Sequence, residues 1–253
     1  MNFDTALISI LLPALLAGLL VISTHVPMGQ EVLRRGIIFI DLAVAQIAAV
    51  GVVLAIVMDW ESGWAIQASA MSMALIGAYL LSLTEHRWPQ QQEAVIGVSF
   101  ILASSAGILL LANNPHGGEH IKTLLGGQIL WVDWNQIWLT LAVYLAILAI
   151  WFGFKGKLGL RGFYLLFAVN VTLSVQLVGV YLVFATLILP GLATINTVQG
   201  KRLINGYLVA AVSYAAGLIM SAYFDLPTGA LVTWILALST VLYRLFDKPA
   251  EIS

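Results

Sequence analysis

The chain has 253 residues, of which 61% are hydrophobic and only 9% are charged, with a net charge of −1 and no cysteine. Soluble domains carry about 25% charged residues and cannot bury so much apolar surface, so the composition excludes a soluble globular protein and predicts a membrane protein. Without cysteine there are no disulfides, thiolate metal sites or cysteine nucleophiles, and without a basic stripe no nucleic-acid partner is expected.

The hydrophobic residues fall into runs near the length of about 20 residues that a membrane-spanning helix needs. The first run begins at Ala6 and is predicted to be a retained span, since no basic residue precedes it and no small-residue cleavage site follows it. The predicted spans are 6–24, 37–58, 64–84, 94–112, 136–154, 163–180, 182–199, 203–222 and 228–246. The expected fold is all-α, a polytopic transmembrane helical bundle of eight to nine spans that forms one domain over residues 1–253.

The Lys and Arg residues predict the orientation, because loops that face the cytoplasm carry an excess of them. With the N-terminus outside and the C-terminus inside, ten of the eleven basic residues lie inside. These are Arg34, Arg35, Arg87, Lys155, Lys157, Arg161, Lys201, Arg202, Arg244 and Lys248. Lys122 alone falls outside, and His25 and His86 are expected at the cytoplasmic interface.

The stretch from Phe163 to Gly200 is flanked by charges that both belong inside, so the chain must cross it an even number of times. Its length allows two short, tilted spans or one span with a re-entrant return. We expect the chain to turn at Gly179 and the returning helix to break at Pro190. Irregular backbone at this depth must be covered by protein or line a cavity, which predicts a central place for the segment.

Asp41 lies about one turn into the second span, where a charge costs about 3 kcal/mol or more and therefore indicates a functional site. It is predicted to line or gate a transport pathway; an ion pair with Arg34 or Arg35 near the interface is the alternative. Gln46 is rotated by about 140° from Asp41 on the helix, so the two do not share a face. Gln46 is a further candidate for the pathway or for a helix-to-helix hydrogen bond.

Asn170 and Gln176 are polar residues of the sixth span and do not align on one face of a helix. Each is a candidate pathway residue, with a packing hydrogen bond as the alternative. Glu93 opens the fourth span, where a carboxylate is expected to stabilise the positive end of the helix. Asp225 is expected to cap the start of the last span.

One outer loop contains His116, Glu119 and His120 in the spacing H-x-x-E-H. Imidazole nitrogen and carboxylate oxygen suit zinc, so these residues are candidates for a transient metal contact at the mouth, or otherwise belong to a solvated loop. Some metalloproteases share the spacing but place it on a helix, whereas Pro115 and the two adjacent glycines favour a loop. A metalloenzyme is therefore the least favoured function.

Five groups of residues stand out in order along nearly the whole chain. They are Leu33–Gly36 with Asp41–Ala43, Gln46 and Gly51; Glu93–Gly97; Leu124–Leu130; Val178–Leu182 with Leu187–Pro190; and Asp225–Ala230. Together they resemble the permease (membrane) subunits of bacterial zinc and manganese ABC importers.

The resemblance implies a homodimeric helical pore in the cell inner membrane that passes a divalent metal ion, zinc or manganese, as its substrate, with no permanently bound cofactor. It also implies three protein partners: a cytoplasmic ABC ATPase dimer, an extracytoplasmic metal-binding protein and a second copy of the chain. The chain itself is then not an enzyme, in agreement with the absence of a G-x-x-x-x-G-K-[ST] nucleotide-binding sequence.

Two places depart from the pattern of the family. One turn after the aspartate of the second span the family usually has a histidine, and this chain has Ala45. The loop after the fifth span, which in the family includes a short helix for ATPase docking, is here only Lys155–Arg161, and its glycines disfavour a helix. Lys155, Lys157 and Arg161 are expected to face the ATPase; an ATPase-independent metal channel or carrier is the alternative.

Overall fold

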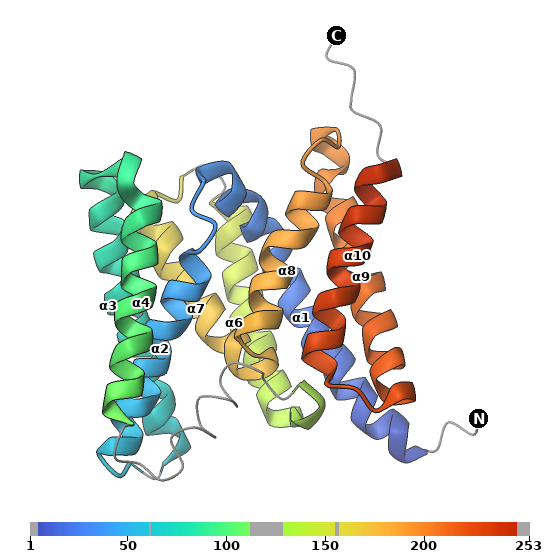
Figure 1. The fold of residues 1–253 in the computed structure, drawn as a ribbon, viewed down its shortest axis with the longest axis horizontal. Helices are drawn as coiled ribbons and strands as arrows, with labels where there is room; N and C mark the ends of the chain where they lie inside the picture. The colour runs from blue at the N-terminus through green and yellow to red at the C-terminus, as the bar shows by residue number, and fades with distance from the viewer. Residues whose placement is uncertain (1–4, 61, 112–128, 155–156, 247–253) are drawn as a thin grey trace. The chain divides into compact units, whose positions relative to one another are not determined.

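The computed structural model describes residues 5–60, 62–111, 129–154 and 157–246, and the regular elements among them are all helical (Figure 1). The α-helices are α1 (Thr5–Arg35), α2 (Ile40–Val57), α3 (Gly63–Arg87), α4 (Gln92–Leu110), α6 (Trp134–Gly153), α7 (Leu160–Val178), α8 (Val180–Ala193), α9 (Gln199–Phe224) and α10 (Thr228–Phe246), with short 3-10 turns η1 (Pro89–Gln91) and η2 (Ile129–Trp131). Within the described residues, eight helices are long and apolar enough to cross a membrane, and α8 is shorter. The predicted all-α transmembrane fold is confirmed.

Seven of the nine predicted spans match a helix to within four residues at either end. The first does not: α1 continues eleven residues beyond the predicted end at residue 24, to Arg35. The chain stays apolar and buried from Val26 to Gly29, and α1 ends only where Gly36 adopts a left-handed conformation with φ 70°. His25 therefore lies inside a helix and is fully buried, and its place at the membrane interface stays a prediction.

Pro27 lies inside α1 and cannot donate the helical hydrogen bond to the carbonyl of Ser23. The hydroxyl of Tyr207, on α9, donates to that carbonyl oxygen at 2.9 Å. A side chain from a neighbouring helix thus replaces the lost backbone bond, as a membrane span requires.

The segment after α7 shows one expected and one unexpected feature. Gly179 interrupts the helix with φ 83° and ψ 162°, a conformation that side chains other than hydrogen disfavour, so a helix ends at the predicted turning point. Pro190, however, does not break the returning helix, which continues to Ala193. Pro190 has no N–H to donate to the carbonyl of Thr186, so one backbone bond is missing close to the helix end. The Pro190 carbonyl itself accepts from the hydroxyl and the N–H of Thr194, at 2.9 and 3.3 Å.

The helices form two compact units. The first comprises residues 1–35, 126–145 and 177–253, where α8 packs against α1, α9 and α10. Gly29 of α1 lies so close to the backbone of α8 that a Cβ atom would collide with the carbonyl of Leu187, and Gly191 of α8 similarly faces Leu33. Small residues let helix backbones approach each other in a membrane.

The second unit comprises residues 36–125 and 146–176, where α2 packs against α3 and α4. The backbones of α2 and α3 meet at Gly51, whose carbonyl accepts a 2.7 Å hydrogen bond from the hydroxyl of Ser69. Gln92, at the start of α4, joins three helices: its amide donates to the carbonyl of Leu81 and to the hydroxyl of Tyr164, each at 2.9 Å, and accepts from Thr84 at 3.0 Å.

Tryptophan side chains mark the helix ends, as expected for residues that sit at the boundary between lipid and water. The exposed ones at or next to the ends of helices are Trp60, Trp64, Trp88, Trp131 and Trp134. Between these ends the helices expose large apolar side chains, for example Ile101 and Leu109 of α4. These surfaces suit contact with lipid.

The Tyr207→Phe substitution should destabilise the protein by about 1–3 kcal/mol, because the Ser23 carbonyl freed by Pro27 then has no donor. The midpoint of thermal unfolding in detergent, followed by tryptophan fluorescence, measures this effect. Tyr223→Phe, at a 62% exposed position of the same helix, is the matched control and should leave the midpoint unchanged. Equal midpoints for the two variants would contradict the role assigned to Tyr207.

Candidate functional site

Asp41 is a buried acid in the first turn of α2, with only 1% of its surface exposed. Neither of its carboxylate oxygens has a hydrogen-bond partner among the described residues. The backbone N–H groups of Asp41 itself and of Leu42, at the positive end of the helix, act on this carboxyl group. An acid in such a place can attract a cation without first having to break a protein contact.

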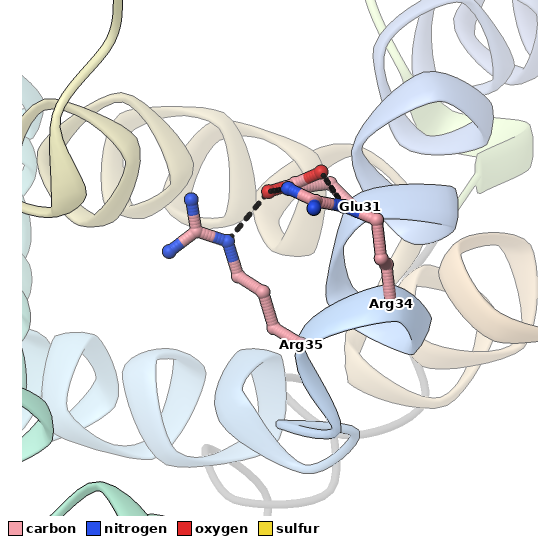
Figure 2. Close-up of polar contacts among 3 residues, drawn as sticks. All are labelled: Glu31, Arg34 and Arg35. Atoms are coloured by element: carbon pink, nitrogen blue, oxygen red, sulfur yellow. Dashed lines mark hydrogen bonds and ion pairs between the residues drawn. The ribbon is translucent and has the colours of Figure 1, made fainter. Parts of the chain in front are cut away.

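The arginines proposed as alternative partners of Asp41 are engaged elsewhere (Figure 2). Arg34 donates from Nε and Nη2 to the two carboxylate oxygens of Glu31, at 2.8 and 2.6 Å, and Arg35 donates from Nε to the same carboxylate at 2.6 Å. The three residues are spaced i, i+3 and i+4 on the last turns of α1, where such pairs face each other. The alternative role of these arginines, an ion pair with Asp41, stays a prediction.

Glu93 places a second carboxylate at the start of α2. It lies in the first turn of α4, as predicted, and its Oε1 accepts a hydrogen bond from the backbone N–H of Phe39 at 3.4 Å, just before α2 begins at Ile40. The carboxylate thus stabilises the positive end of a neighbouring helix as well as that of its own. Two acids, Asp41 and Glu93, lie at this one helix start.

The other predicted pathway residues differ in burial. Asn170 on α7 is fully buried, Gln46 on α2 is half-buried, and Gln176 on α7 is exposed. All lie with Asp41 in the second unit. Their role in a pathway stays a prediction.

The candidate metal residues His116, Glu119 and His120 lie outside the described residues, as do Lys122 and Lys155. In the part of the chain that the structure does describe, no group of three His, Cys, Asp or Glu residues could hold a metal ion. Any metal contact within the described helices therefore involves fewer than three such side chains.

The predicted ATPase-facing loop is a short connection between α6 and α7. Its described part is a turn in which the N–H groups of Lys157 and Leu158 donate to the carbonyl of Phe154, at 2.8 and 3.2 Å. Arg161 lies not in the loop but in the first turn of α7, with its guanidinium 6.0 Å from the centre of the Tyr79 ring. No docking helix is present among the described residues of this connection.

Two features were missed from the sequence. The pairing of Glu31 with Arg34 and Arg35 could have been found from its helical spacing. The position of Asp225 could not have been found from the sequence. Asp225 ends α9 in a left-handed conformation, with φ 53°, and does not cap α10, which starts at Thr228. The cause is local, because the N–H of Leu226 turns back to the carbonyl of Ser221 at 3.2 Å.

Comparison with known proteins agrees with this architecture. Residues 7–163 and 153–247 match the model of the ABC 3 transport family. The manganese transport system membrane protein MntC of Halalkalibacterium halodurans is 27% identical over 249 residues, covering 90% of this chain and 84% of that protein. The chelated iron transport system membrane protein YfeC of Yersinia pestis is 25% identical over 191 residues, 67% of this chain and 65% of that protein.

Among solved structures, PsaBC from Streptococcus pneumoniae in complex with Fab has a similar fold, with a TM-score of 0.75 and 19% identity. The likeness covers 95% of this chain and 92% of that one. At this level of identity it shows the fold alone, a multi-pass helical membrane protein.

The Gln92→Ala substitution should lower the stability of the protein by about 2 kcal/mol or more, because it leaves the buried hydroxyl of Tyr164 and the carbonyl of Leu81 without the amide that donates to them. The neighbouring exposed residue provides the control, Gln91→Ala, which removes an amide of the same size. Thermal unfolding midpoints of the two purified variants measure the difference. A Gln92→Ala midpoint equal to that of Gln91→Ala would show that the junction of α3, α4 and α7 does not depend on this side chain.

Proposed function

Because this chain belongs to the ABC 3 transport family, we propose that it is the membrane-spanning permease subunit of an importer for a divalent transition metal ion in the bacterial inner membrane. The names of its relatives, which concern manganese and chelated iron transport, support a metal substrate. The observation that carries the proposal is Asp41: a fully buried acid without a hydrogen-bond partner among the described residues, in a helix that crosses the membrane.

Asp41 supplies the negative charge that compensates for the lost hydration of the cation. The candidate ligands that accompany it on the pathway, Gln46, Asn170 and Gln176, offer amide oxygens. Ala45 offers no imidazole where the family usually has one. Carboxylate and carbonyl oxygens suit manganese better than zinc, so of the two metals manganese is the proposed substrate. A single charge holds the ion weakly enough for release.

The energy for import comes from a separate cytoplasmic ATPase dimer in this proposal, and a second copy of the chain completes the pore. An extracytoplasmic metal-binding protein delivers the ion from the side on which the N-terminus lies. The distribution of Lys and Arg supports this orientation, with the connections before α2, α4, α7 and α9 facing the ATPase.

A second candidate function is an ATPase-independent metal channel or carrier of the same fold. The short α6–α7 connection favours it, because its described residues form a turn and no helix. The family membership favours the ATP-driven importer instead. Retention of an ATPase by the chain purified from native membranes separates the two.

Asp41→Asn should reduce metal uptake by at least about tenfold, since even outer-shell partners of a metal ligand are worth about 10–100-fold in affinity. The substitution removes the charge and keeps the size of the side chain. Uptake of radiolabelled Mn²⁺, with Zn²⁺ measured alongside, is compared in cells that express equal amounts of each variant.

The matched control is Asp59→Asn, at an exposed acid just beyond the other end of α2. Its backbone has φ 55°, which asparagine also adopts readily, so the fold and the uptake should both be retained. Normal uptake by Asp41→Asn would exclude Asp41 as the pathway acid.

A further inference from the structure

The connection between α8 and α9, residues 194–198, is a compact hydrogen-bonded turn. The N–H of Thr197 donates to the carbonyl of Thr194 at 3.0 Å. The N–H groups of Lys201 and Arg202 then donate to the carbonyl of Val198, at 2.9 and 3.1 Å, and start α9. The turn therefore has a defined backbone between two helices.

Two arginines fix the end of α8 at this turn. Arg202 donates from Nη2 to the carbonyls of Ile195 and Thr197, at 2.8 and 3.4 Å, and Arg244 of α10 donates from Nη1 to the carbonyl of Leu192 at 3.4 Å. The last carbonyls of a helix lack partners within the helix and carry its negative end, so the guanidinium of Arg244 stabilises the end of α8, while Arg202 bonds to the turn that follows it. The α8–α9 turn is thus attached to both α9 and α10.

A tyrosine of α10 completes the attachment. The hydroxyl of Tyr243 lies 3.2 Å from the hydroxyl of Thr197 and accepts a 2.6 Å hydrogen bond from the amide of Asn205 on α9. Side chains from two helices thus hold one five-residue turn. A turn that only connected two spans would not need this many contacts.

The outer face of the α8–α9 turn presents two apolar side chains, Ile195 and Val198, which are 42% and 61% exposed. Lipid contact accounts for exposed apolar residues along the spans, but these two lie beyond the end of α8, beside the exposed polar residues Asn196 and Gln199. Exposed Lys201 and Arg244 add positive charge around them. Rigid apolar anchors with a charged rim are typical of a protein-protein contact.

We propose that the α8–α9 turn is the docking surface for the ATPase, and this inference rests on the proposed function. The partner surface is an apolar depression that receives Ile195 and Val198, rimmed by acidic residues that pair with Lys201 and Arg244. The turn takes the place of the α6–α7 connection, which has no helix among its described residues.

The position of the turn suits coupling as well as binding. α8 packs against α1, α9 and α10, and the hydroxyl of Thr186 in its middle lies 2.6 Å from the buried hydroxyl of Tyr214. Movement of an ATPase bound at residues 194–198 is therefore passed through α8 into the packed interior of this unit.

Site-specific crosslinking tests the inference, because the chain has no cysteine and a single introduced thiol is unique. Val198→Cys and Trp88→Cys are each labelled with a maleimide photo-crosslinker in inverted native membranes, and the products are identified by mass spectrometry. Trp88 is the matched control, an exposed apolar residue in the turn between α3 and α4, which is assigned to the same side of the membrane. Crosslinking of Val198→Cys, and not of Trp88→Cys, to a protein with a G-x-x-x-x-G-K-[ST] sequence supports the proposal.

Crosslinking of Val198→Cys to phospholipid alone overturns it, as does an ATPase crosslinked only from Trp88→Cys. In addition, Val198→Glu should reduce the amount of ATPase that co-purifies with the chain by at least about tenfold, which is the effect expected of a hot-spot residue. The thermal unfolding midpoint of this variant should be unchanged. An undiminished amount of co-purified ATPase in that variant also overturns the assignment of the docking surface. Absence of ATPase from the unsubstituted chain overturns instead the proposed function on which it rests.

Discussion

The structure depends on one constraint: in lipid, no water is available to bond the polar groups of the backbone, so the chain must satisfy them itself. Where α1 loses a bond at Pro27, the hydroxyl of Tyr207 takes its place. This contact between α1 and α9 thus joins two helices and also compensates for an interruption in one of them.

Asp41 is informative because it departs from this rule. Its carboxylate is buried, yet within the described residues nothing donates to it, and the nearby arginines pair with Glu31. A buried acid without a protein partner lowers the stability of the fold, and a pathway for cations gives a reason to keep it. Gln92 differs from Asp41 in this respect, because the buried amide of Gln92 forms hydrogen bonds that join helices.

Hydrophobic runs and the distribution of Lys and Arg were enough to predict the all-α fold, most helix bounds and the break at Gly179, because length, hydropathy and the conformational freedom of glycine act locally. The continuation of α1 past His25 was missed, since the partners that bury this stretch come from elsewhere in the chain. The sequence indicated Asp41 as a candidate, whereas the pairing of Arg34 and Arg35 with Glu31 was missed although it is local to one helix. The compact turn at 194–198 gave no sequence signal, because the hydrogen bonds that fix it and the end of α8 include those of Tyr243 and Arg244, which lie far along the chain.

The central claim is that this chain is the permease of an ATP-driven metal importer. Its most direct test is uptake of radiolabelled Mn²⁺ by cells that express the chain with its co-purifying ATPase, either intact or with the phosphate-binding lysine of that ATPase replaced by alanine. The account predicts that uptake falls to the level of cells without the chain when the ATPase is inactive. Uptake that continues unchanged with the inactive ATPase would contradict it and identify an uncoupled channel or carrier.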